Sequence, residues 1–112
     1  MQKNYQNLGY CCFLCSRLKK SEATLEKDRK FFNFYVHTAA DKVQSDLKEM
    51  KKISSNQMFL IRGYCDSLLK ELREDQQDSS QWLGLAQGSL RGALKALEEF
   101  SVKRPGRFFF RE

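Results

Sequence analysis

The sequence predicts an all-α fold, an elongated helical hairpin or three-helix bundle with coiled-coil-like pairing. Apolar residues recur every three or four positions over most of residues 22–102, which is the spacing of an amphipathic helix. The chain has one proline, Pro105, and it follows this region. The length of 112 residues fits one domain, because domains commonly have about 100 to 150 residues. We therefore divide the chain into segments 1–20, 21–102 and 103–112.

The N-terminal segment, residues 1–20, joins an apolar run at 8–15 to basic residues that follow it. The run is too short to cross a bilayer, which takes roughly 20 apolar residues. Basic residues also stand where a signal peptide would have small residues at its cleavage site. We expect a short apolar helix that docks on the helical body. The alternative is membrane contact through this segment, because acylation of Cys11, Cys12 or Cys15 beside basic residues would anchor a protein at an anionic membrane surface.

The first long helix is predicted at about residues 22–53. Ser21 suits its N-cap, and neither glycine nor proline interrupts it. At 1.5 Å per residue it would be roughly 48 Å long, whereas a compact chain of this size is about 34 Å across. An elongated molecule follows from this difference. The apolar stripe comprises Leu25, Phe32, Val36, Ala40, Val43, Leu47 and Met50.

A second helix is predicted at about residues 55–76, after a restart. Ser54 and Gln57 have the spacing of a capping box, and Ile53 and Met58 have that of a hydrophobic staple. Both signals favour a new helix N-terminus at this point. The following stripe comprises Met58, Ile61, Cys65, Leu68 and Leu72.

A third helix is predicted at about residues 79–102. Residues 75–80 contain no apolar side chain, and Asp78 with Gln81 could cap the new helix. The alternative is one continuous helix, because leucines and Gln76 keep a seven-residue spacing across this point. Pro105 and Gly106 stop the helix, and residues 103–112 form a basic aromatic tail.

The net charge of +6 lies at the ends of the chain. Residues 1–20 carry four bases and no acid, residues 101–112 carry four bases and one acid, and residues 21–100 are close to neutral. Nucleic-acid binding needs bases clustered on one face, so we do not expect it of the helical body. The alternative is a nucleic-acid-associated protein that uses its basic termini.

A ridge of small residues marks the third predicted helix. Each glycine costs about 1 kcal/mol relative to alanine within a helix, so the cost implies a compensating contact. Close approach of another helix would supply it, either from a partner or from the chain's own first long helix. This glycine ridge comprises Gly84, Gly88, Gly92 and Ala96.

Aromatic residues crowd one turn of the first long helix. Phe31, Phe32, Phe34 and Tyr35 cannot all lie on one stripe, so some must lie outside the main helix contact. We predict that surplus aromatic and small residues form a protein interface; the alternative is that the aromatics fill the thick end of a self-contained core, as in a bundle of more than two helices. Its predicted residues are Gly84, Gly88, Gly92, Ala96, Trp82, Phe31, Phe34 and Tyr35.

Catalytic and metal-binding patterns are weak. His37 is the single histidine, and the acidic residues follow exposed helix faces. Cys12 and Cys15 have the spacing of two zinc ligands, but a second close pair is missing, and Cys65 lies on an apolar stripe. We predict no enzyme, no catalytic residues, no metal and no cofactor.

The predicted function is that of a non-catalytic helical adaptor, or subunit of a larger assembly, that acts through helix–helix pairing. Its expected partners are other helical proteins in a hetero- or homo-oligomer. The four cysteines form no disulfide framework and no secretory signal is recognised, so the expected location is intracellular, in the cytoplasm or nucleus.

Overall fold

The computed structural model describes residues 4–20, 26–74 and 81–103. This part of the chain forms four α-helices: α1 (Asn4–Lys20), α2 (Glu26–Glu49), α3 (Ser55–Glu74) and α4 (Gln81–Lys103). Apart from residues 50–54, every described residue is helical. The predicted all-α class is confirmed. The prediction of a hairpin or a three-helix bundle is wrong, because the bundle has four helices.

The additional helix is α1, which has 17 residues and belongs to the core. Leu8, Cys11 and Cys15 lie at positions i, i+3 and i+7, so they share one helical face. All three side chains are buried. The segment is therefore a full member of the bundle, because its inner face is apolar throughout although its C-terminal end is basic.

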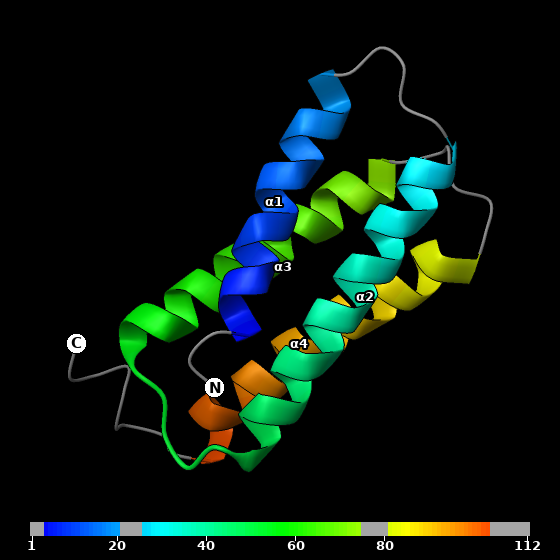
Figure 1. Ribbon diagram of the computed structural model, residues 1–112. Helices are drawn as coiled ribbons and strands as arrows, with labels where there is room; N and C mark the ends of the chain where they lie inside the picture. Colours follow the sequence, from blue (N-terminus) through cyan, green and yellow to red (C-terminus); the bar gives the residue numbers. More distant parts are fainter. Residues whose placement is uncertain (1–3, 21–25, 75–80, 104–112) are drawn as a thin grey trace.

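The helices pack in the circular order α1, α2, α4, α3. Figure 1 shows α2 beside α4 on one side of the molecule and α1 crossing over α3 on the other. Contacts between α2 and α4 rise together in residue number, from Phe34 with Trp82 to Gln44 with Gly92, so these two helices are parallel. In Figure 1, α3 carries the chain back from the end of α2 toward the start of α4.

The bundle is elongated, with principal extents of 48 × 23 × 22 Å and a radius of gyration of 14.8 Å. A compact chain of this length would have a radius of gyration of about 13 Å. One core cluster runs through it and draws on all four helices and on Ile53 between α2 and α3. Asn33 and Ser89 are the buried polar residues of the described part.

The start of α3 confirms the predicted cap. The backbone N–H of Gln57 donates a hydrogen bond to Ser54 Oγ over 3.1 Å, and the Ser54 hydroxyl donates to Gln57 Oε1 over 3.3 Å. Ile53 and Met58, on either side, are both buried. Residues 50–54 therefore separate α2 from α3. The predicted interruption between the second and third long helices, at residues 76–80, lies outside the described residues, as does the tail at 104–112.

Candidate functional site

Large apolar side chains remain exposed on the outside of this bundle. Phe31 is 67% exposed and Phe34 is 45% exposed, although both lie on α2, which packs against α1 and α4. Isolated exposed apolar residues are ordinary, whereas a contiguous group indicates a binding surface. The exposed large apolar residues of the described part are Tyr10, Phe13, Phe31, Phe34, Phe59 and Leu85.

Ring contacts form two groups, one between α1 and α2 and one between α2 and α4. Tyr10 on α1 stacks on Phe13 with ring centroids 6.1 Å apart, and it meets Tyr35 of α2 edge-on at 6.2 Å. Phe34 of α2 meets Trp82 of α4 edge-on at 4.8 Å. Edge-to-face and offset pairs at these spacings are favourable. We call the two groups, together with the exposed Phe31 on α2, the aromatic surface; it comprises Tyr10, Phe13, Phe31, Phe34, Tyr35 and Trp82.

The helical period explains why α2 contributes three residues to this surface. Phe32 and Val36 face the core and are buried, which turns the neighbouring positions outward. Phe31, one turn from both Phe34 and Tyr35, then lies between them on the outer side of α2. The expectation that the crowded aromatics cannot share one stripe is confirmed by these exposures.

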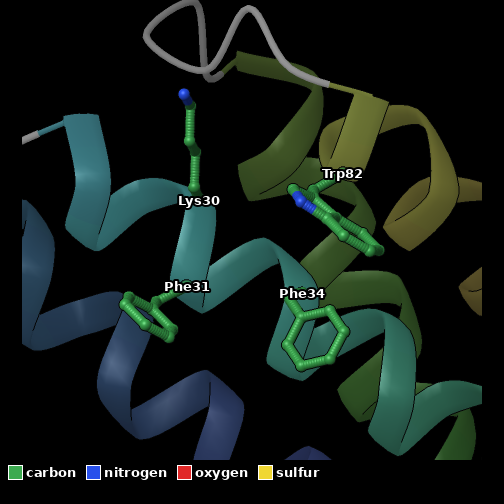
Figure 2. Close-up of a pocket in the computed structure, with 4 residues that line it drawn as sticks. All are labelled: Lys30, Phe31, Phe34 and Trp82. Atoms are coloured by element: carbon green, nitrogen blue, oxygen red, sulfur yellow. The ribbon is translucent and has the colours of Figure 1, made fainter.

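A hollow of about 340 Å³ lies within the aromatic surface, where α2 meets α4. Its lining residues are Lys30, Phe31 and Phe34 from α2 and Trp82 from α4 (Figure 2). In Figure 2, the Lys30 side chain extends away from the two phenylalanine rings. The hollow therefore combines three aromatic walls with one basic side chain.

A second basic side chain lies against the other end of the aromatic surface. The guanidinium carbon of Arg17 is 5.8 Å from the centroid of the Phe13 ring, the arrangement of a cation–π contact. Arg17 and Lys30 are both exposed.

Behind Trp82, a polar contact holds α2 and α4 together. Nδ1 of His37 and Oγ of Ser89 share a hydrogen bond of 2.6 Å, and Ser89 is buried. The His37 ring also lies 6.2 Å from the Trp82 ring. A buried hydroxyl needs a hydrogen-bond partner, and His37 supplies one for Ser89. This bond therefore links α2 to α4 beside Trp82.

The predicted glycine ridge divides into two parts. A Cβ added at Gly92 would lie 2.5 Å from Oε1 of Gln44 on α2, and Ala96 is buried, so this end packs within the chain. Gly84 and Gly88 are exposed, and an added Cβ at either would meet nothing within 4 Å. The outer end of the ridge therefore contacts no neighbouring helix of the described chain closely.

The N-terminal cysteines lie mostly inside the bundle. Cys11 and Cys15 are buried, while Cys12 is half-buried and its thiol donates to the Tyr64 carbonyl over 3.7 Å. Burial, aided by neighbouring thiols, raises the pKa of Cys11 to about 12 and that of Cys12 to about 11. Acylation of Cys11 or Cys15 would require the thiol to leave the core, and a protonated thiol is a poor nucleophile.

The fourth cysteine, Cys65, also bears on whether the cysteines could bind a metal ion. Cys65 of α3 is buried, and burial followed by the charge of Asp66 raises its pKa to about 12. Metal ligation requires thiolates, which these surroundings disfavour. Among the described residues, no group of three or more His, Cys, Asp or Glu side chains is arranged to hold a metal ion.

A second hollow, of about 400 Å³, opens between α1 and α3. Its lining mixes two thiols, two hydroxyls, one carboxylate and one leucine, and no aromatic ring contributes to it among the described residues. It lacks the single chemical character of the first hollow. Its lining residues are Cys12, Cys15, Ser16, Ser67, Leu68 and Glu71.

The sequence interpretation missed part of the aromatic surface. Tyr10, Phe13 and Arg17 of α1 and Lys30 of α2 were not among its predicted interface residues. A signal was present, because Tyr10, Phe13 and Arg17 recur at three and four positions and lie off the stripe of buried residues on α1.

Comparison with known proteins adds no relative to this description. The chain matches no protein-family model, no curated protein and no solved structure. Within the described residues, none of the four helices has the combination of length and apolar character that crossing a bilayer requires. The function of the chain is therefore inferred from the four-helix bundle and its aromatic surface.

Proposed function

We propose that this chain is a non-catalytic helical adaptor, or a subunit of a larger assembly, and that it binds a helical partner through the aromatic surface. The observation that carries the proposal is the exposure of Phe31 and Phe34 on α2, between one ring contact to α1 and another to α4. Leaving such side chains in water forgoes about 25 cal/mol per Å² of apolar area. A partner that covers them recovers this free energy.

The composition of the surface also supports binding. Tryptophan, tyrosine and arginine are the residues that most often dominate the energetics of protein interfaces. Here Trp82 contacts the exposed Phe34, while Tyr10 contacts Tyr35 and the exposed Phe13, over which Arg17 lies. A rim of basic residues around aromatic anchors is typical of an interface with a polar edge.

The open glycines of α4 support a helical partner in particular. Gly84 and Gly88 leave the backbone of α4 accessible on a face that, at about 100° per residue, points away from the face of Trp82. A helix laid across this region could approach more closely than it could over larger side chains. The four reduced cysteines are compatible with the reducing interior of a cell, where we propose that the assembly forms.

Affinity capture with matched variants tests the proposal. Tagged wild-type chain, the double variant Phe31→Ala/Phe34→Ala and the control Phe59→Ala are expressed at equal levels. Phe59 is 75% exposed on α3, outside the aromatic surface, so its replacement removes a similar ring elsewhere. We expect a reproducible set of partners that the double variant loses and the control retains.

One outcome of the capture experiment would contradict the proposal. Identical partners for all three proteins, at unchanged amounts, would show that the aromatic surface is not the binding site. Circular dichroism and thermal unfolding of each purified variant verify that any loss of binding occurs in a folded protein. Because both phenylalanines are exposed, we expect near wild-type stability.

A further inference from the structure

We infer that Cys12 and Cys15 form a two-thiolate site for a soft monovalent metal ion of the Cu(I) class, in the hollow between α1 and α3. The site shares no residue with the aromatic surface, so it goes beyond the proposed function and does not depend on it. The spacing of the two cysteines, the hollow that they line and the ligand atoms around it all support this site.

The fold brings both thiols to one hollow. Cys12 and Cys15 are three positions apart on α1, and side chains at this spacing are neighbours with Cβ atoms about 5 to 6 Å apart. Both line the hollow of about 400 Å³ that α3 closes on its other side. The Cys12 thiol lies 3.7 Å from the Tyr64 carbonyl oxygen, which places it between the two helices.

The hollow is accessible from the surface, because Ser16 and Ser67, which also line it, are both exposed. An ion can therefore reach the half-buried Cys12 without separating α1 from α3. Cys11 and Cys65 are buried in the core and are not among the described residues that line the hollow. The four cysteines of the chain thus divide into two that reach the hollow and two that do not.

The two thiols of the hollow are close enough for their charges to interact. After burial, the charge of Cys15 is the second cause that raises the pKa of Cys12 to about 11. A cation held between two thiolates removes this repulsion. Binding of one ion replaces two S–H bonds by two metal–sulfur bonds and releases two protons, and no group changes its oxidation state.

The ligand atoms around the hollow select a soft ion that needs few ligands. Its described lining offers two thiols, two hydroxyls and the carboxylate of Glu71. Thiolates select Cu(I), whereas carboxylate and hydroxyl oxygens suit harder ions. Structural zinc takes four ligands in a tetrahedral arrangement, of which this lining supplies two thiolates. Cu(I) is satisfied by two thiolates in a line.

Competition with a chromogenic Cu(I) chelator tests the site. The full chain, with reduced thiols and in the absence of oxygen, is titrated into the chelator–Cu(I) complex. The copper that the chain removes is measured from the loss of the chelator absorbance. Zn(II) is tested in the same way with a zinc chelator, and reduced glutathione is the reference for a thiol outside any site. Circular dichroism of each sample follows the helices.

We expect the folded chain to bind one Cu(I) far more tightly than glutathione does, and more tightly than the chain binds Zn(II). Cys12→Ala and Cys15→Ala should each weaken Cu(I) binding by at least about 100-fold, the upper end of what loss of a supporting group around a metal costs. Cys11→Ala and Cys65→Ala are the matched controls and should retain it, as should Ser67→Ala. The helical signal should stay unchanged on binding.

Several results would overturn the inference. Unchanged Cu(I) affinity in Cys12→Ala would remove the site, as would an affinity no greater than that of glutathione. Equal losses in all four cysteine variants, or a fall in helical signal on binding, would assign the metal to an opened chain. Zn(II) binding as tight as that of Cu(I) would exclude a two-thiolate site. If Cys15→Ala does not fold, the half-buried Cys12 still decides the outcome.

Discussion

At the scale of single residues, glycines with the same spacing have different surroundings. Gly92 approaches Gln44 of α2, Gly9 approaches the Tyr64 ring of α3, and Gly84 and Gly88 face open space. The first two permit close contact between helices of this chain. Gly84 and Gly88 lower the stability of the helix and make no such contact. Their replacement therefore leaves the contacts within the chain intact, so that any effect on partner binding can be measured apart from folding.

Replacing either open glycine by alanine should stabilise the chain. We expect Gly84→Ala and Gly88→Ala each to raise the free energy of unfolding by about 1 kcal/mol, the difference in helix propensity. Gly9→Ala is the comparison, because its Cβ would lie 3.0 Å from Cζ of Tyr64, so its gain should be smaller or absent. Urea denaturation measures all three. A destabilised Gly88→Ala would contradict the open surroundings described here.

The cap of α3 gives a second prediction at this scale. Ser54→Ala removes the acceptor for the Gln57 backbone N–H, so the free energy of unfolding should fall by about 1 kcal/mol. Ser55→Ala, which alters an exposed neighbour in the first turn, serves as the control and should change it by less than about 0.5 kcal/mol. Equal effects of the two changes in thermal or urea unfolding would argue against the cap.

At the scale of the elements, α1 combines a core face with an exposed aromatic face. Its inner face is buried and its outer face supplies Tyr10, Phe13 and Arg17 to the aromatic surface. Deleting residues 1–20 would therefore remove part of the core together with basic charge. The nucleic-acid alternative is better tested by Arg17→Gln, since that change removes charge and leaves the inner face intact.

Truncating a core side chain of α1 should show that this helix is integral to the bundle. Leu8 is fully buried, so Leu8→Ala should lower the free energy of unfolding by about 2 to 5 kcal/mol. Gln6→Ala, at an exposed position on the same helix, should have little effect. A loss of less than about 1 kcal/mol for Leu8→Ala in urea denaturation would mean that α1 docks only loosely.

Periodicity in the sequence predicted which face of each helix is buried better than it predicted which helices pack together. The stripe of α3, the part of the first stripe from Phe32 to Leu47 and the cap at Ser54 follow from local spacing, and the structure confirms them. The circular order α1, α2, α4, α3 could not be predicted, because an apolar face does not specify which helix it meets. The division of the glycine ridge has the same cause, since it depends on how α4 is rotated against α2.

At the scale of the whole molecule, the core accommodates three buried thiols and a half-buried one without a disulfide. Each contributes to packing as a small apolar group while it stays protonated. The raised pKa values of Cys11, Cys12 and Cys65 therefore link the stability of the entire bundle to pH on the alkaline side.

Alkaline pH should unfold the chain more readily. The ordinary thiol pKa is 9.0, and in the fold it rises to about 12 for Cys11 and Cys65 and to about 11 for Cys12. The unfolded chain loses these protons first, so stability is intact below pH 9 and declines as pH rises from 9 toward 12. Urea denaturation at pH 7.5 and pH 10 measures the decline.

The matched variants for this prediction are Cys11→Ala and Cys65→Ala. Each lowers stability at pH 7.5 by creating a cavity, but each should also reduce the further loss between pH 7.5 and pH 10. An unchanged loss in both variants would assign the alkaline sensitivity to other groups. Tyr35 is one of these, because burial, followed by the charges of Cys11 and Tyr10, raises its pKa.

The pairing of α2 with α4, which follows only after α3, has a consequence for the synthesis of the protein on the ribosome. Translation proceeds at about 5 to 20 residues per second, so roughly 3 to 11 seconds separate Glu49 from Lys103, the last residues of the two helices. During that interval the nascent α2 lacks the helix that covers most of its apolar face. Slower decoding downstream of α2 would prolong the period in which a chaperone can engage it.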